Sequence, residues 1–156
     1  MQLDYARAMF DGLNFTVRPE ACSPDQVQAL EKQLAITFPA PYRDFLLWMG
    51  QSRAGMLLAS DWLPDDLPLL KDKAKKLLAD NKFPQPLPDD AFVFWMSQGY
   101  VFTFLRLSQG DNSPVYRYHG TLETTTFTPI NQSFAEWLQA QIQEHVDRMK
   151  SLGQSW

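Results

Sequence analysis

The chain has 156 residues, a formal net charge of −4 and a pI of about 5.0. An apolar fraction of 45% and a charged fraction of 21% are those of an ordinary globular protein, and they argue against disordered and fibrous classes. Affinity for a phosphate backbone depends largely on clustered Lys and Arg, so the acidic balance also argues against a nucleic-acid-binding protein. The length fits one self-sufficient core, and we expect a single domain over residues 1–156.

The N-terminal segment indicates where the chain resides. It carries Asp4 and Asp11 and lacks a long apolar run, so we expect no secretory signal. No stretch reaches the roughly 18 apolar residues of a membrane span. The single cysteine, Cys22, excludes an internal disulfide and fits a reducing compartment. We therefore expect a cytoplasmic protein that does not bind a membrane.

Two helices are predicted in the first third of the chain. Ser23 and Gln26 have the spacing of a capping box, and Pro24 suits the first turn of the helix that follows them. A second helix is predicted over 42–49, because its apolar residues recur at helical spacing and Gly50 ends the run.

A third helix is predicted over 66–81. Its leucines recur at helical spacing and its lysines would face water, which is typical of a helix that covers another element. The segment "FPQPLPDD" follows it. Its alternating prolines predict an extended, stiff connection to the strands.

A block of strands and a final helix complete the chain. Ser133 and Glu136 form a second capping-box pattern, and the apolar face that follows continues to Gly153. Strands are predicted over about 91–96, 100–107, 114–118 and 124–130. This order predicts an α+β fold in which a single antiparallel sheet of about four or more strands packs against N-terminal helices and a long C-terminal helix.

The stretch "FVFWMSQGYVFTFLRL" is dense in aromatic residues and predicts the central hairpin. A three-residue loop of Ser97, Gln98 and Gly99 suits a turn closed by a glycine bulge. One face would then carry five aromatic side chains of about 1,000 Å² in total, well above the roughly 300–600 Å² that soluble monomers expose, so we expect it in the core. The predicted cross-strand pairs on that face are Met96 with Tyr100, Phe94 with Phe102, and Phe92 with Phe104.

The same stretch has an alternative interpretation as an RNA-recognition sheet. "QGYVFTFL" matches that aromatic signature at Gly99, Tyr100 and Phe102. It departs from the signature at Gln98, where a basic residue is expected, and at Leu105, where an aromatic residue is expected. Together with the acidic charge, these departures favour a structural role for the aromatic residues.

No motif predicts a catalytic residue, a cofactor-binding residue or a metal ligand. The chain has no glycine loop for phosphate, no Cys/His cluster with metal spacing and no nucleophile elbow. We expect His119 and His145 to be turn or partly buried histidines, and Cys22 to be a surface cysteine without a catalytic partner. The paired acids fit turn and capping positions; an enzyme would need two of them to converge in a pocket.

Three segments occur in a particular order: "ALEKQLAITFPAPYRDFLLWMG" at 29–50, "GYVFTFLRLSQGDNSPVYRY" at 99–118 and "NQSFAEWLQAQI" at 131–142. Their order and spacing resemble the SUKH superfamily of Smi/Knr-like domains. The resemblance covers about 25–142 and leaves a helical insert at about 54–88 unmatched. The matching positions are Leu30, Glu31, Pro39, Tyr42, Phe45, Leu46, Gly50, Pro114, Val115, Tyr116, Tyr118, Ser133, Phe134, Trp137 and Leu138.

The resemblance implies binding rather than catalysis. Bacterial members of the superfamily are similar to immunity proteins that neutralise toxins delivered between competing cells, often nucleases or deaminases, and other relatives act as regulators or scaffolds. It therefore implies a non-catalytic immunity protein that binds a secreted or contact-delivered toxin. A regulatory or scaffolding module of the same fold is the alternative, and a small enzyme with a carboxylate-based site is a third interpretation.

A toxin that attacks nucleic acid tends to be basic, so an acidic surface would complement it. We accordingly expect a protein partner and no nucleic acid, and we expect the contacts to come from acids outside the core and from tryptophans near them. These candidate partner-binding residues are Asp61, Trp62, Asp65, Asp66, Asp89, Asp90, Trp95 and Asp111.

Overall fold

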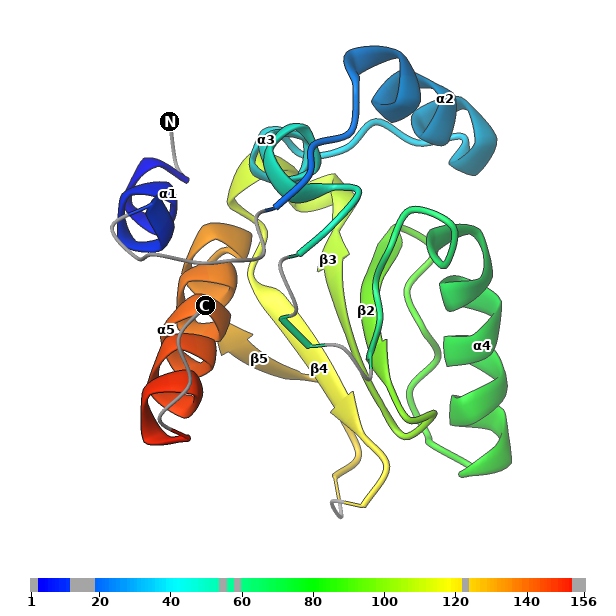
Figure 1. The fold of residues 1–156 in the computed structure, drawn as a ribbon. Coiled ribbons are helices and arrows are strands. Elements are labelled where there is room, and N and C mark those ends of the chain that lie inside the picture. The colour runs from blue at the N-terminus through cyan, green and yellow to red at the C-terminus, as the bar shows by residue number, and fades with distance from the viewer. Residues whose placement is uncertain (1–2, 12–18, 54–55, 58–59, 122–123, 153–156) are drawn as a thin grey trace. The chain divides into compact units, whose positions relative to one another are not determined.

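The computed structural model describes residues 3–11, 19–53, 56–57, 60–121 and 124–152 (Figure 1). It divides into two compact units. We call Met1–Leu58 together with Phe134–Trp156 the helical unit, and Ala59–Ser133 the sheet unit. A five-stranded antiparallel sheet, N-terminal helices and a C-terminal helix confirm the predicted α+β fold class.

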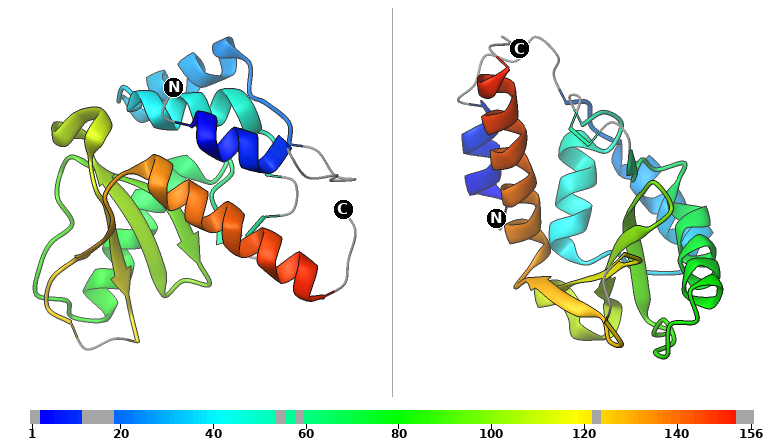
Figure 2. Two further views of the ribbon diagram at one scale, coloured as in Figure 1. Left: turned by 90° about the vertical axis from the view of Figure 1, so that its left-hand side faces the viewer. Right: turned by 90° about the horizontal axis from the view of Figure 1, so that it is seen from below.

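The helical unit is built from helices α1, α2, α3 and α5, and α1 lies beside α5 (Figure 2). The second and third match the predicted helices, whereas α1 was not predicted from the sequence. The predicted end of the last helix at Gly153 lies outside the described residues. None of the described helices is both long and apolar enough to cross a membrane. The bounds are Asp4–Asp11 for α1, Pro24–Leu34 for α2, Ala40–Met49 for α3 and Phe134–Ser151 for α5.

The capping box of α2 forms as its spacing predicts. The Ser23 hydroxyl accepts a hydrogen bond from the Gln26 amide at 3.1 Å, and the Gln26 side-chain oxygen accepts one from the Ser23 amide at 2.8 Å. Two amides that the helix leaves without partners are thereby satisfied. Pro24 occupies the first turn, where its missing N–H costs nothing.

Aromatic rings from α3 and α5 form the centre of the helical unit. Phe134 lies 5.2 Å from Tyr42 and 5.4 Å from Phe45, centroid to centroid, both in edge-on orientation. It also stacks on Trp137 at 5.8 Å. All four are buried and belong to the matched segments, so the segments hold the fold through ring packing.

Cys22 is buried, so the expectation of a surface cysteine is wrong. Its amide donates to the Leu46 carbonyl at 2.9 Å, and its sulfur lies against Gly50 so closely that a Cβ added there would be 2.3 Å from Sγ. Burial raises the pKa of the thiol, and the nearby charge of Arg53 offsets only part of the increase. The thiol is therefore protonated at neutral pH and is a poor nucleophile.

The sheet unit is an antiparallel meander in the order β1-β2-β3-β4-β5 (Figure 1). The short edge strand β1 and the 3₁₀ segment η1 were not predicted, whereas α4, β2, β3, β4 and β5 correspond to predicted elements. The bounds are Ser60–Asp61 for β1, Leu67–Asp80 for α4, Ala91–Ser97 for β2, Val101–Arg106 for β3, Leu107–Asn112 for η1, Val115–His119 for β4 and Thr128–Asn131 for β5.

The predicted register of the β2–β3 hairpin is wrong at the turn. Gln98 and Gly99 both have positive φ, 53° and 70°, and the Tyr100 amide donates to the Ser97 carbonyl at 3.2 Å. Two successive positive φ angles are the signature of a type I′ turn. Ser97 pairs with Val101, which leaves Tyr100 in the connection with 38% of its surface exposed.

A bulge at Phe94 changes the register a second time. Val93 pairs with Phe104, and Phe92 pairs with Leu105. One extra residue reverses the alternation of side chains beyond it, so Phe92 shares a face with Leu105 rather than with Phe104. The five aromatic residues therefore do not lie on one face, although four of them are buried as expected.

The face that carries Phe102 and Phe104 holds the aromatic cluster of the sheet unit. Phe102 lies 5.4 Å from Tyr118, and Phe104 lies 5.1 Å from Phe127. The Asn81 amide, just after α4, donates to the Tyr118 hydroxyl at 2.8 Å, so the end of α4 reaches this face. The buried side of α4 consists of Leu67, Leu70, Ala74 and Leu78.

The observed register predicts unequal effects for two aromatic residues that the sequence pattern had placed together. We expect Phe102→Ala to lower the free energy of unfolding by about 3–5 kcal/mol, because it leaves a cavity in the aromatic cluster. Tyr100→Ala removes a partly exposed ring and should cost about 1 kcal/mol or less. Urea denaturation of both variants measures the difference, and equal losses would contradict the register.

His145 gives the helical unit a dependence on pH. It is buried on α5, where desolvation lowers its pKa from the ordinary value of 6.5 and the charge of Arg148 lowers it further. As the pH falls through the ordinary pKa of 6.5, the unfolded state therefore binds a proton at His145 more readily than the folded state does. Protonation of His145 thus favours unfolding.

We expect the free energy of unfolding to decrease between about pH 7.5 and pH 5.5, and His145→Gln to remove most of that decrease. Urea denaturation of wild type and His145→Gln at the two pH values measures it. The same slope in wild type and His145→Gln would show that another group is responsible.

Candidate partner-binding surface

Five of the six predicted acids lie at one end of the sheet unit, where β2 begins and β3 ends. The pair at 89–90 directly precedes β2, and η1 connects β3 to β4. The Lys71 ammonium, in the second turn of α4, donates to the Asp89 carbonyl at 2.6 Å, so α4 also begins at this end. We call this surface the acidic end; its acids are Asp65, Asp66, Asp89, Asp90 and Asp111.

Three of the predicted residues lie elsewhere. Asp61 is on β1 opposite Met96, toward the hairpin, and its carboxylate is 4.0 Å from the Lys73 ammonium. Trp62, expected at the surface, is buried, and the half-buried Trp95 is on β2, where it pairs with Thr103 of β3. The acidic end therefore contains five of the eight candidate residues and neither tryptophan.

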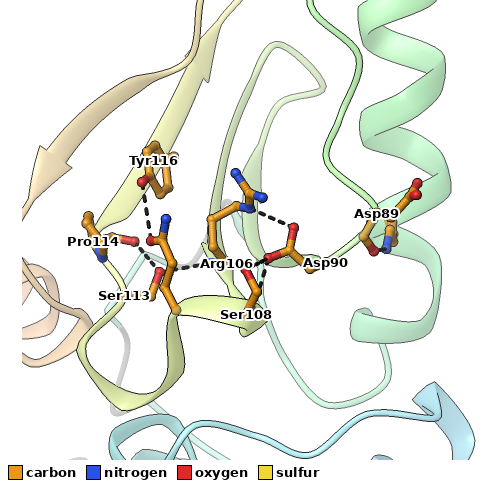
Figure 3. Close-up of polar contacts among 9 residues, drawn as sticks. Asp89, Asp90, Arg106, Ser108, Ser113, Pro114 and Tyr116 are labelled. Carbon is orange, nitrogen blue, oxygen red and sulfur yellow. Dashed lines mark hydrogen bonds and ion pairs between the residues drawn. The ribbon is translucent and has the colours of Figure 1, made fainter.

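The Asp90 carboxylate organises the acidic end (Figure 3). Its Oδ1 accepts from the Arg106 Nε at 2.7 Å, and its Oδ2 accepts from both the amide and the hydroxyl of Ser108. Burial acts to raise the pKa of Asp90, but the hydrogen bonds from Ser108 and Arg106 outweigh it and hold that pKa below its ordinary value. The carboxylate is therefore ionised at neutral pH and fixes the start of η1.

The other end of η1 is also fixed. The buried Ser113 hydroxyl accepts from the Arg106 amide and donates to the Pro114 carbonyl, both at 2.9 Å. The Tyr116 hydroxyl donates to the Gln109 side chain at 3.3 Å (Figure 3). Because η1 is held at both ends, the surface that it presents is ordered before any partner binds.

The two carboxylates of each pair, 65–66 and 89–90, have different roles. Asp90 holds η1, and Asp66 accepts from the Leu63 amide at 3.0 Å, which closes the turn before α4. Asp65 and Asp89 are exposed, and neither carboxylate makes an ion pair with any residue that the structure describes. One acid of each pair thus has a structural role and the other faces water.

Two exposed leucines accompany these acids, and sequence reasoning missed them. Leu63 is 42% exposed and Leu69 is 57% exposed, on either side of the turn that leads into α4. The signal was present in the sequence: Leu70, Ala74 and Leu78 form an i, i+4, i+8 stripe, and Leu69 is one position off it. Exposed leucines next to carboxylates provide apolar area within a charged surface.

His119 lies far from these acids within the sheet unit. It pairs with Val101 at the first residue of β3, whereas Arg106, which binds Asp90, is the last residue of that strand. At about 3.3 Å per residue the separation along the strand is roughly 17 Å. The described residues also contain no group of three or more His, Cys, Asp or Glu positioned to hold a metal ion. The arrangement suits electrostatic contact with a macromolecule.

The fold defines the chain as an α+β protein with an antiparallel sheet. The model of the SMI1 / KNR4 family (SUKH-1) matches residues 21–140, and the chain belongs to this family. The match confirms the resemblance derived from the three sequence segments. A comparison with curated proteins finds no relative that matches the chain.

The structural role of Asp90 predicts a difference between neighbouring acids. We expect Asp90→Ala to lower the free energy of unfolding by about 2–3 kcal/mol, because it removes charge-assisted hydrogen bonds from Arg106 and Ser108. Asp89→Ala should change it by about 0.5 kcal/mol or less. Urea denaturation gives both values, and amide hydrogen exchange at Ser108 should accelerate only in Asp90→Ala. Equal behaviour of the two variants would rule out the proposed division of roles.

Proposed function

We propose that this protein is an immunity protein that neutralises a secreted or contact-delivered bacterial toxin of the nuclease or deaminase class. It acts in the cytoplasm by direct binding and carries out no catalysis itself. Membership in the SMI1 / KNR4 family supports a role in protein binding. The observation that carries the proposal further is the acidic end, where acids from three separate chain segments, 65–66, 89–90 and 111, lie together and Asp65, Asp89 and Asp111 are exposed.

The expected partner has a basic surface, because an enzyme that acts on nucleic acid uses Lys and Arg to hold phosphates. Asp65 and Asp89 face water and are available to pair with such cations. Complementary charge accelerates the encounter of the two proteins. The bound immunity protein then covers the basic surface that the toxin needs to hold its substrate. The exposed Leu69 supplies apolar contact that slows dissociation.

Rigidity of the acidic end favours tight binding. Asp90 and Ser113 hold η1 at both ends, and Asp66 fixes the turn before α4. A surface that is ordered in the free protein loses little conformational entropy on association. The acids with structural roles thus position the acids that make contact.

The test uses the toxin domain that we expect to be encoded next to the gene for this protein, expressed from an inducible promoter in a bacterial host. Wild type should restore growth. The double substitution Asp65→Lys/Asp89→Lys should slow association with the purified toxin domain by about 10- to 100-fold, with a smaller change in dissociation. Leu69→Ala should accelerate dissociation by about tenfold. Biosensor kinetics at two salt concentrations measure these changes.

Matched controls keep the interpretation specific. Glu20→Lys/Glu144→Lys changes the net charge equally at exposed sites in the helical unit, and Leu152→Ala removes an equally exposed leucine. All variants should melt within about 2 °C of wild type. Slower association in the charge control as well would contradict the acidic end as the contact surface. A failure of wild type to restore growth, with recovery of a resident cellular protein instead, would favour the regulatory or scaffolding alternative.

A further inference from the structure

A hollow of about 370 Å³ lies in the sheet unit between the last turns of α4 and the segment 82–87 that follows it. Its base includes the buried Leu78 and Leu87, and Lys75 and Lys82 at its margin are exposed. Its full lining is Lys75, Leu78, Ala79, Lys82, Phe83, Pro84, Gln85, Pro86 and Leu87. We call it the α4 groove.

Hydrogen bonds and ring contacts keep the α4 groove open. The Phe83 amide donates to the Leu78 carbonyl at 2.9 Å, and the Phe83 ring packs edge-on against Tyr118 at 5.0 Å. The Gln85 side-chain oxygen accepts from the Phe127 amide at 3.1 Å. Segment 82–87 is thereby attached both to the end of α4 and to the sheet side of the unit, so the groove exists before a ligand arrives.

The α4 groove combines apolar walls with two cations. Ala79, Pro84 and Pro86 contribute apolar surface, and the prolines have no N–H to offer a ligand. Other lysines of α4 are engaged: Lys71 with the Asp89 carbonyl, Lys73 with Asp61 and Lys76 with Asp80. Within the described part of the chain, Lys75 and Lys82 pair with no carboxylate.

The backbone at Lys82 supports a role for its side chain. Lys82 has φ of 53°, its amide donates to the Ala79 carbonyl, and the Phe83 amide donates to the Leu78 carbonyl, which together form a Schellman motif. Glycine is the favoured residue at this left-handed position, because any Cβ there is strained. A lysine at such a position places a cation at the margin of the groove despite that strain.

We propose that the α4 groove binds a peptide segment in which an apolar residue lies between two carboxylates. Lys75 lies on α4 and Lys82 lies just beyond its end, so the two cations are at separate points on the margin of the groove. In a polyproline II peptide, residues i and i+3 lie on the same side, roughly 9 Å apart, so two carboxylates with this spacing pair with the two cations. The apolar side chain then occupies the space over Leu78 and Leu87. The peptide is acidic, whereas the toxin expected at the acidic end is basic, so the peptide belongs to a second, independent partner.

The experiment titrates the full ¹⁵N-labelled protein with acetyl-Gly-Glu-Leu-Pro-Glu-Leu-Gly-amide. Amide shifts should concentrate in 75–87, and the matched peptide with Gln in place of both Glu should bind at least about fivefold more weakly, because it lacks the two charges. Lys75→Gln/Lys82→Gln should weaken binding of the acidic peptide by about fivefold or more. These substitutions are at exposed positions, so the fold is retained, and the melting temperature checks this.

Two controls separate the groove from general charge effects and from the acidic end. Lys73→Gln/Lys76→Gln removes the same number of charges from α4 at positions outside the groove and should change the affinity by less than about twofold. Asp65→Lys/Asp89→Lys should leave peptide binding unchanged, so that the proposed function and this proposal fail or succeed separately. No shifts in 75–87 at millimolar peptide, equal binding of the Gln peptide, or equal loss in the control variant would each overturn the proposal.

Discussion

The Asp90 carboxylate is the interaction on which the arrangement of the sheet unit's acidic end depends. It joins the residue before β2 to the last residue of β3 and to the first turn of η1. Hydrogen bonds to an ionised group are stronger than neutral ones, and here they connect segments that are 16 to 18 positions apart. With this link in place, the neighbouring Asp89 is held where its own carboxylate faces water.

The sheet unit also separates charges of opposite sign. Lys75 and Lys82 lie at the α4 groove, near the end of that helix, and the exposed Asp65 and Asp89 lie where it begins. The net charge of −4 does not reveal this separation, because a sum over the chain contains no information about where the charges lie. A chain of moderate charge can thus offer two electrostatically distinct surfaces, each selecting partners by complementarity.

Local signals in the sequence predicted local structure well. The Ser23 and Gln26 capping box, the stop at Gly50 and the extent of α4 depend on residues within a few positions, and each formed as predicted. The hairpin register could not be predicted in the same way, because aromatic residues on both strands hide the bulge at Phe94. The convergence of acids from distant segments depends on the topology of the sheet unit. The burial of Trp62 depends on it as well.

The close packing of Cys22 against Gly50 makes the lone thiol a chemical probe of the helical unit. A thiol that is buried and protonated reacts with a thiol reagent only when the surrounding structure opens, so its labelling rate measures that opening. Both proposed binding surfaces belong to the sheet unit. Labelling of one cysteine in the presence and absence of a partner therefore shows whether binding to one unit changes the local stability of the other.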